Sequence, residues 1–128
     1  MDRTQILKAF NDHFMEFVDD VRQAFPDDAD LATVQEALLS FRKANPRLIL
    51  TVFKESVVGR YRAEVEKGDI EFFISKDYKS DVEGSAKSSV ILEKIDALRE
   101  PIRLMPKEEQ AKVIKYLQNL CKLCDLYN

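Results

Sequence analysis

Residues 7–26 read LKAFNDHFMEFVDDVRQAFP, and their large apolar side chains recur at steps of three or four residues. This spacing places the side chains on one stripe of an α-helix, because a helical turn takes 3.6 residues. The stripe consists of Leu7, Phe10, Phe14, Phe17, Val21 and Phe25. We therefore predict an amphipathic helix over residues 6–25, which Pro26 ends by disfavouring the α conformation in the residue before it.

A second and a third helix follow along the chain. Residues 31–41 repeat the apolar spacing, so we predict a helix to about Ala44 that Asp28 or Asp30 caps through a side-chain oxygen. Asn45 suits an N-cap and Pro46 suits the first helical position. The third helix is then expected to run from Pro46 to Lys67.

The third helix has a clear end and a competing interpretation at its start. Gly68 is expected to stop it in the left-handed conformation. Its first turns, LILTVF, are apolar nearly all round, which indicates a centrally buried element. The same residues, 48–53, could form a β-strand because β-branched side chains are frequent there. Pro46 and the long polar continuation favour the helix.

The second half of the chain predicts shorter helices followed by a long one. Asp69 can cap a short helix after Gly68, and Ser88 or Ser89 can cap a later one. Pro101 is expected to end or kink that later helix. Pro106 suits the first turn of the last helix, where glutamates favour the positive end of the helix dipole.

The composition agrees with a helical protein that forms a hydrophobic core without disulfide bonds or metal ions. The chain has 128 residues, of which 45 % are hydrophobic, with three glycines and four prolines. Strand-rich folds need many turns that draw on Gly and Pro. We find no internal repeat and no long linker. The expected fold is all-α, a single compact bundle-like domain over residues 1–128 with about five or six helices.

Charge and hydropathy exclude some classes of protein. Lys and Arg total 20 against 23 Asp and Glu, which gives a net charge of −3, whereas proteins that coat duplex nucleic acid usually carry a basic excess. No apolar run reaches the length of about 18 residues that spans a bilayer. The N-terminal residues lack the pattern of a secretory signal. With two cysteines, we expect an intracellular protein without a disulfide framework and without membrane association.

The stretch GDIEFFISKDYKSDVEGS, residues 68–85, is the first candidate site. An EF-hand loop started at Asp77 would place Lys79, Val82 and Ser88 where ligands or glycine are required, so a calcium site is not expected. Aromatic residues dominate interface hot spots. We therefore predict a partner-binding surface at Phe72, Asp77, Tyr78 and Asp81. The alternative is that the aromatic rings belong to the core.

A second candidate site uses basic residues of the middle third of the chain. On an ideal helix, Arg47 and Lys54 lie about 20° from alignment. Together with Arg60 and Arg62 they could form a phosphate-facing stripe. The alternative is that they balance the acidic first helix, whose carboxylates in turn could oppose a basic partner.

Sites for chemistry are weakly indicated. Cys121 and Cys124 have redox or zinc spacing, but zinc needs four ligands and His13 is the one histidine, so we expect buried thiols. His13 itself is expected at the surface or at its boundary. An enzyme would depend on glutamates of the third helix, namely Glu55 with Glu64 or Glu66. We predict a non-enzymatic protein with no cofactor and no metal.

Three blocks carry a resemblance to known proteins. They are FNDHFMEFVDDVRQAFPDD (10–28), FRKANPRLIL (41–50) and GDIEFFISKDYKSD (68–81). In this order the blocks resemble small helical proteins of large nucleocytoplasmic DNA viruses of algae and protists, over about the first 80 residues. That group has no established activity, so no functional residue follows. The resemblance implies a viral protein, in the virion or in the viral factory of an infected cell.

These observations lead to two expected functions. The first is a protein–protein interaction or assembly component, which binds another protein or associates with itself. The second is a nucleic-acid- or transcription-associated factor that uses the basic middle helix. The second function predicts binding that weakens steeply with salt, because phosphate contacts release counterions.

Overall fold

The computed structural model describes residues 2–75 and 86–127, apart from the side chains of Phe72, Ser75, residues 86–89 and Leu92. The described residues contain helices and connecting turns and no strand, which confirms the all-α prediction. The helices are α1 (Arg3–Ala24), α2 (Ala29–Ala44), α3 (Leu48–Phe53), the π-helical segment η1 (Lys54–Val58), α4 (Gly59–Lys67), α5 (Glu71–Ser75), α6 (Ala86–Asp96), α7 (Arg99–Arg103) and α8 (Lys107–Leu126).

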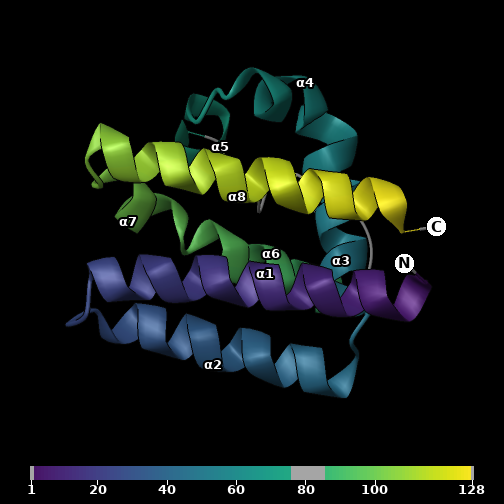
Figure 1. Cartoon of the computed structure of the whole chain (residues 1–128). Helices are drawn as coiled ribbons and strands as arrows, with labels where there is room; N and C mark the ends of the chain where they lie inside the picture. Colours follow the sequence, from purple (N-terminus) through teal and green to yellow (C-terminus); the bar gives the residue numbers. More distant parts are fainter. Residues whose placement is uncertain (1, 76–85, 128) are drawn as a thin grey trace.

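The long helices pack in a layered arrangement (Figure 1). α1 packs against α2 on one side and against α8 on the other, and α4 packs on the side of α8 away from α1. α1 and α8 run in opposite directions. Both chain termini consequently lie at the same end of the molecule, and α3 also lies at that end.

The first two helices form where the sequence predicts them, although α1 begins three residues earlier, at Arg3, and ends one residue earlier, at Ala24. Phe10, Phe14, Phe17 and Val21 are buried along α1. The N-cap Asp2 adds a capping box, because its side chain accepts from the N–H of Gln5 (2.8 Å) and the Gln5 side chain accepts in return (3.0 Å). α2 ends at Ala44 and is capped by Asp28, whose Oδ1 accepts from the N–H groups of Asp30 and Leu31.

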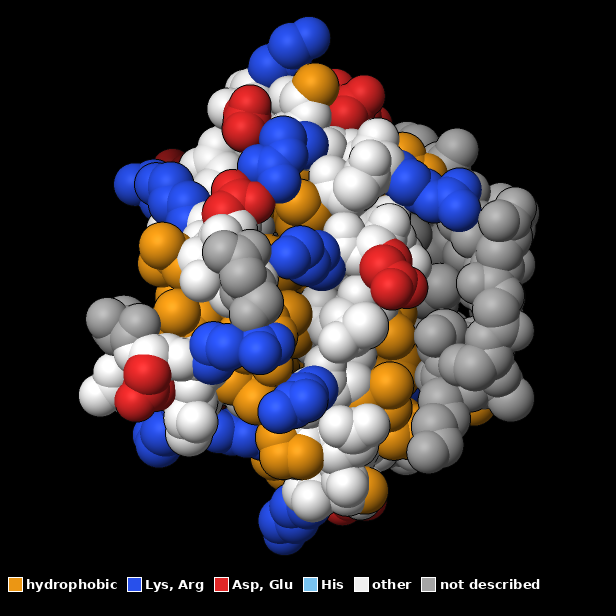
Figure 2. Space-filling model, turned by 90° about the vertical axis from the view of Figure 1, so that its right-hand side faces the viewer, with side chains coloured by type: hydrophobic (Ala, Val, Ile, Leu, Met, Phe, Trp, Pro, Cys, Tyr) orange, Lys and Arg blue, Asp and Glu red, His pale blue; other side chains and the backbone are white. Residues whose placement is uncertain are grey.

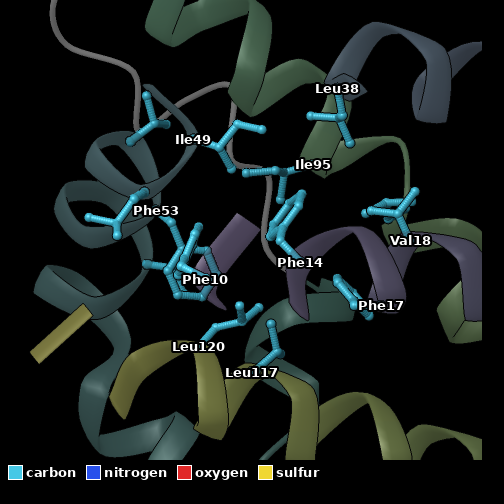
Figure 3. Packing of buried hydrophobic residues seen from close by; sticks show 14 of the residues in the cluster. Phe10, Phe14, Phe17, Val18, Leu38, Ile49, Phe53, Ile95, Leu117 and Leu120 are labelled. Carbon is cyan, nitrogen blue, oxygen red and sulfur yellow. The ribbon is translucent and has the colours of Figure 1, made fainter. Parts of the chain in front are cut away.

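The core centres on aromatic side chains where α3 crosses α1 (Figure 3). The ring of Phe53 lies edge-on to the rings of Phe10 and Phe14, at centroid distances of 5.6 and 6.4 Å. Leu117 and Leu120 of α8 close this cluster from the other side. Four of the six residues of α3 are buried, namely Ile49, Leu50, Val52 and Phe53, which confirms the predicted buried element and excludes the strand.

The helix from Leu48 to Lys67 is continuous but not regular. It begins two residues later than predicted: Pro46 lies in a turn, and Asn45 Oδ1 accepts from the N–H of Arg47 (3.2 Å). η1 has π geometry, and Tyr61 departs from helical angles with φ −126° and ψ 22°. Gly68 ends the helix with φ 76°, as predicted.

Three predicted boundaries in the second half were wrong. Ser88 and Ser89 lie inside α6, which begins at Ala86, and so they do not cap it. The break expected at Pro101 occurs instead before α7, and Pro101 is the third residue of α7. Proline is tolerated there because the first N–H groups of a helix have no intrahelical acceptor. Pro106 is the N-cap of α8 rather than a helical residue.

The two glycines of the third helix provide a paired test of its geometry. We expect Gly68→Ala to destabilise the protein by about 1 kcal/mol, because an L side chain at positive φ strains the backbone. The added methyl would meet nothing nearer than Gln118 Nε2 at 3.9 Å, so strain is the whole effect. Gly59→Ala is the control, since Gly59 has helical angles and should gain up to about 1 kcal/mol. Urea unfolding measures the change in the free energy of unfolding for each variant. Equal changes would contradict the left-handed conformation of Gly68.

Candidate functional site

A histidine and a tyrosine meet where α1 faces α8. The rings of His13 and Tyr116 are 4.8 Å apart between centroids, and the Tyr116 ring lies 5.6 Å from that of Phe17. Phe17 is buried, whereas His13 and Tyr116 are partly exposed. The two partly exposed rings therefore form an aromatic floor at the protein surface.

Two adjoining hollows extend along this floor. One has a volume of about 480 Å³ and the other about 270 Å³, and His13, Glu16 and Asn119 line both. We call the two hollows together the α1–α8 groove. Its remaining lining residues are Ala9, Asp12 and Asp20 of α1 and Lys112, Lys115, Tyr116, Lys122 and Leu123 of α8.

The two rims of the α1–α8 groove carry opposite charge. The carboxylates belong to α1 and the ammonium groups belong to α8. In the part of the chain that the structure describes, no ion pair joins the two rims: Asp12 pairs with Lys8 (2.7 Å) and Arg42 (2.5 Å), and Lys112 lies 3.5 Å from Glu109. Glu16 and Lys115 thus remain available on facing rims.

His13 is incompletely satisfied in the groove. Its Nδ1 lies 3.8 Å from the carboxylate of Glu16, and its Nε2 is buried without a hydrogen-bond partner among the described residues. A buried polar atom without a partner costs free energy. The expectation of a boundary histidine is met, since 24 % of the side chain is exposed.

Tyr116 links the floor to the acidic rim. Its hydroxyl donates a hydrogen bond to Asp20 Oδ2. Burial and the Asp20 carboxylate together raise the pKa of Tyr116 to about 12. The phenol therefore remains a neutral donor over the physiological pH range, and it holds α1 and α8 together across the groove.

A second groove lies between α4 and α8, with a volume of about 280 Å³. Arg62 donates two hydrogen bonds to Asp125, at 2.9 and 2.6 Å, and these hold the pKa of that carboxyl below its usual range. Gln118 Nε2 donates to the carbonyl of Val65 at 3.0 Å. These contacts join α4 to α8. The polar side chains that line this groove therefore already have partners within the chain.

The two cysteines are buried free thiols, as predicted. Cys121 lines the α4–α8 groove and Cys124 lies deeper in the core. Burial raises the pKa of Cys121 to about 11 and that of Cys124 to about 12. Both are therefore protonated at neutral pH, which disfavours thiolate chemistry.

The predicted basic residues lie near the end of the molecule that holds both termini. Lys and Arg side chains gather on this face, with apolar side chains between them (Figure 2). Lys54 Nζ donates to the carbonyl of Tyr127 at 3.1 Å, and Arg62 binds Asp125, so these two residues contact the C-terminal end of α8. Arg47 and Arg60 are exposed. The π turn of η1 has more residues per turn than an α-helix, so alignment along an ideal helix does not extend from Arg47 to Arg60 and Arg62.

The first predicted site lies largely outside the described residues. Asp77, Tyr78 and Asp81 belong to the part of the chain that is not described, and Phe72 is described in its backbone alone, within α5. Its neighbour Phe73 is buried, which agrees with the alternative that this ring belongs to the core.

Comparison with known proteins gave no relative. No family model, no curated protein and no solved structure matches the chain. Within residues 2–75 and 86–127, no three His, Cys, Asp or Glu side chains gather as metal ligands do. None of the helices described combines the length and the apolar character needed to cross a bilayer.

Sequence reasoning missed the α1–α8 groove. It placed His13 at the surface or at its boundary and considered the carboxylates of the first helix as a group that could oppose a basic partner, without relating either to the last helix. One signal was present: Ala9, His13, Glu16 and Asp20 are spaced four, three and four residues apart, which defines a second stripe on the same helix. Its partner stripe on α8 begins about 90 residues later, and no local pattern joins the two.

The contact between Tyr116 and Asp20 can be tested by titration. We expect Asp20→Asn to lower the pKa of Tyr116 from about 12 towards 10, although burial keeps part of the increase. Because the folded pKa exceeds the unfolded one, the linked stability is present below about pH 10 and is lost as pH rises through about 12. Absorbance of tyrosinate measures the shift. Asp19→Asn is the control, and an equal shift there would contradict the direct hydrogen bond.

Proposed function

We propose that the protein is a non-enzymatic component of a protein assembly and that the α1–α8 groove binds its protein partner. The observation that carries the proposal is the surface groove itself, with an aromatic floor between a carboxylate rim and an ammonium rim. Aromatic side chains supply much of the binding energy in interfaces, and complementary charges on the rims select the partner.

The shape of the groove supports a helical surface as its occupant. α1 has 22 residues and α8 has 20, so each helix extends for about 30 Å. The lining residues lie between positions 9 and 20 of α1 and between 112 and 123 of α8, so the groove follows about 17 Å of each helix. A groove that follows two helices can accept an amphipathic helix along its length. Ala9 and Leu123 contribute apolar side chains to one half of this groove, which Asp12, Glu16 and Lys122 also line.

The proposal includes a viral setting. It rests on the resemblance of residues 10–28, 41–50 and 68–81 to small helical proteins of large nucleocytoplasmic DNA viruses. In that setting the assembly would be the virion or a complex of the viral factory. The partner-binding role proposed for Phe72, Asp77, Tyr78 and Asp81 would add a second contact surface to the same assembly.

Site-specific photo-crosslinking tests the groove. A benzophenone amino acid replaces Asn119, which lines both hollows, and in a control chain it replaces Ser40, which is exposed on α2. We expect discrete protein adducts from position 119 that disappear when Glu16→Lys is added. Equal adducts from both positions, or none from position 119, would contradict the groove as the binding surface.

A second function is favoured by the basic face of Figure 2. In this alternative the face binds nucleic-acid phosphates, and Arg47 contributes as an exposed residue at the start of α3. Lys54 and Arg62 contribute less because they already contact the carbonyl of Tyr127 and the carboxylate of Asp125.

Duplex binding separates the two functions. If the basic face binds nucleic acid, a random-sequence duplex should bind at about 50 mM salt and dissociate near 200 mM. Arg47→Ala should then weaken binding and reduce the salt dependence by about one phosphate contact. Lys107→Ala, at the opposite end of the molecule, is the control. Fluorescence anisotropy measures both, and binding that neither salt nor Arg47→Ala weakens would eliminate this alternative.

A further inference from the structure

The charges and the apolar residues of the α1–α8 groove are arranged along two directions. Across the groove, carboxylates of α1 face ammonium groups of α8. Along it, the two halves differ: Glu16, Asp20, Lys112 and Lys115 line the 270 Å³ hollow. Ala9 and Leu123 line the 480 Å³ hollow together with Glu16 and Lys122, and Asp12 in that hollow is already paired with Lys8 and Arg42. The groove therefore has a charged half and a more apolar half.

An exposed leucine extends the apolar half. Leu126 follows Leu123 by three residues and lies on the same side of α8. The residue is 58 % exposed, which makes it one of the most exposed large apolar residues among those described. Burial of this exposed apolar side chain against a partner would contribute favourable free energy.

We propose that the partner in the groove is a second copy of this chain, related by a twofold axis that runs along the groove. This rotation turns one groove onto the other and exchanges the rims. It places α1 of each copy over α8 of its partner. Because the axis is parallel to the groove, each hollow of one copy faces the same hollow of the other copy. Carboxylates then meet ammonium groups, and the apolar half with Leu126 meets its own counterpart. The inference rests on the groove being a protein-binding surface.

The other face-to-face twofold arrangement is disfavoured by the same residues. An axis across the groove would place α1 over α1 and α8 over α8, so that Glu16 would oppose carboxylates and Lys115 would oppose ammonium groups. It would also place the charged half over the apolar half. Like charges in contact are strongly unfavourable. The distribution of charge thus selects one symmetric dimer, in which the contacts close on themselves.

Charge reversal with complementation tests the dimer in the full chain. In the proposed arrangement Glu16 of each copy lies near Lys115 of the other, because both line the same hollow. Light scattering should give a mass about twice the monomer's 14.8 kDa. Glu16→Lys or Lys115→Glu should each raise the dissociation constant about tenfold or more, since each change creates two like-charge contacts per dimer. An equimolar mixture of the two variants should form a heterodimer in which both contacts are restored.

Matched controls make the outcome decisive. Glu36→Lys and Lys67→Glu make the same charge changes at exposed positions on α2 and α4, outside the groove, and should leave the dimer intact. Failure of the mixture to form heterodimers, or equal weakening by the controls, would overturn the arrangement. Recovery of dimers in the mixture shows that both variants fold.

The two proposals fail in different ways. A purified chain that stays monomeric at every concentration overturns the self-association inference. If position 119 then still crosslinks to another protein, the proposed function stands with a different partner. If the chain is monomeric and position 119 gives no adduct, both proposals fail.

Discussion

The packing of Phe53 against Phe10 and Phe14 fixes the direction of the helix from Leu48 to Lys67 across α1. Because that direction is fixed, the helix continues past α1, and α4 packs on the side of α8 that faces away from α1. There Arg62 donates hydrogen bonds to Asp125. α8 is thereby held between α1 and α4. Deletion of a buried phenylalanine side chain costs about 3–5 kcal/mol, a large part of the stability of a small domain. The groove on the α1–α8 surface depends on this contact.

The charged residues divide into those that hold the fold and those that face outward. Lys54 and Arg62 bind groups at the C-terminal end of α8, where positive charge also complements the helix dipole. Arg42 joins α2 to α1 through Asp12. Among the residues that the structure describes, Glu16 and Lys115 make no ion pair across the groove, so their charge is available to a partner. A net charge of −3 conceals this division, since it sums over both groups.

Local patterns predicted the elements whose causes are local. The 3-4 spacing located α1 and α2, Asp28 capped α2, and Gly68 ended α4, because capping and left-handed geometry depend on neighbouring residues. The patterns failed where packing decides. The π geometry of η1 and the break before α7 have no local signature, and Ser88 lies inside α6 despite its preference for a cap. Tertiary contacts override such weak preferences.

The sequence by itself determined the helical class, the buried stripes and the positions of several helix ends, since periodicity and caps act within a few residues. It also placed Cys121 and Cys124 inside the core. Only the tertiary structure decided which second stripe of α1 meets which stripe of α8. Asp20 and Tyr116 are 96 positions apart in the chain, and their hydrogen bond exists because the core orients both helices. The site therefore depends on helix packing, which short-range sequence patterns do not encode.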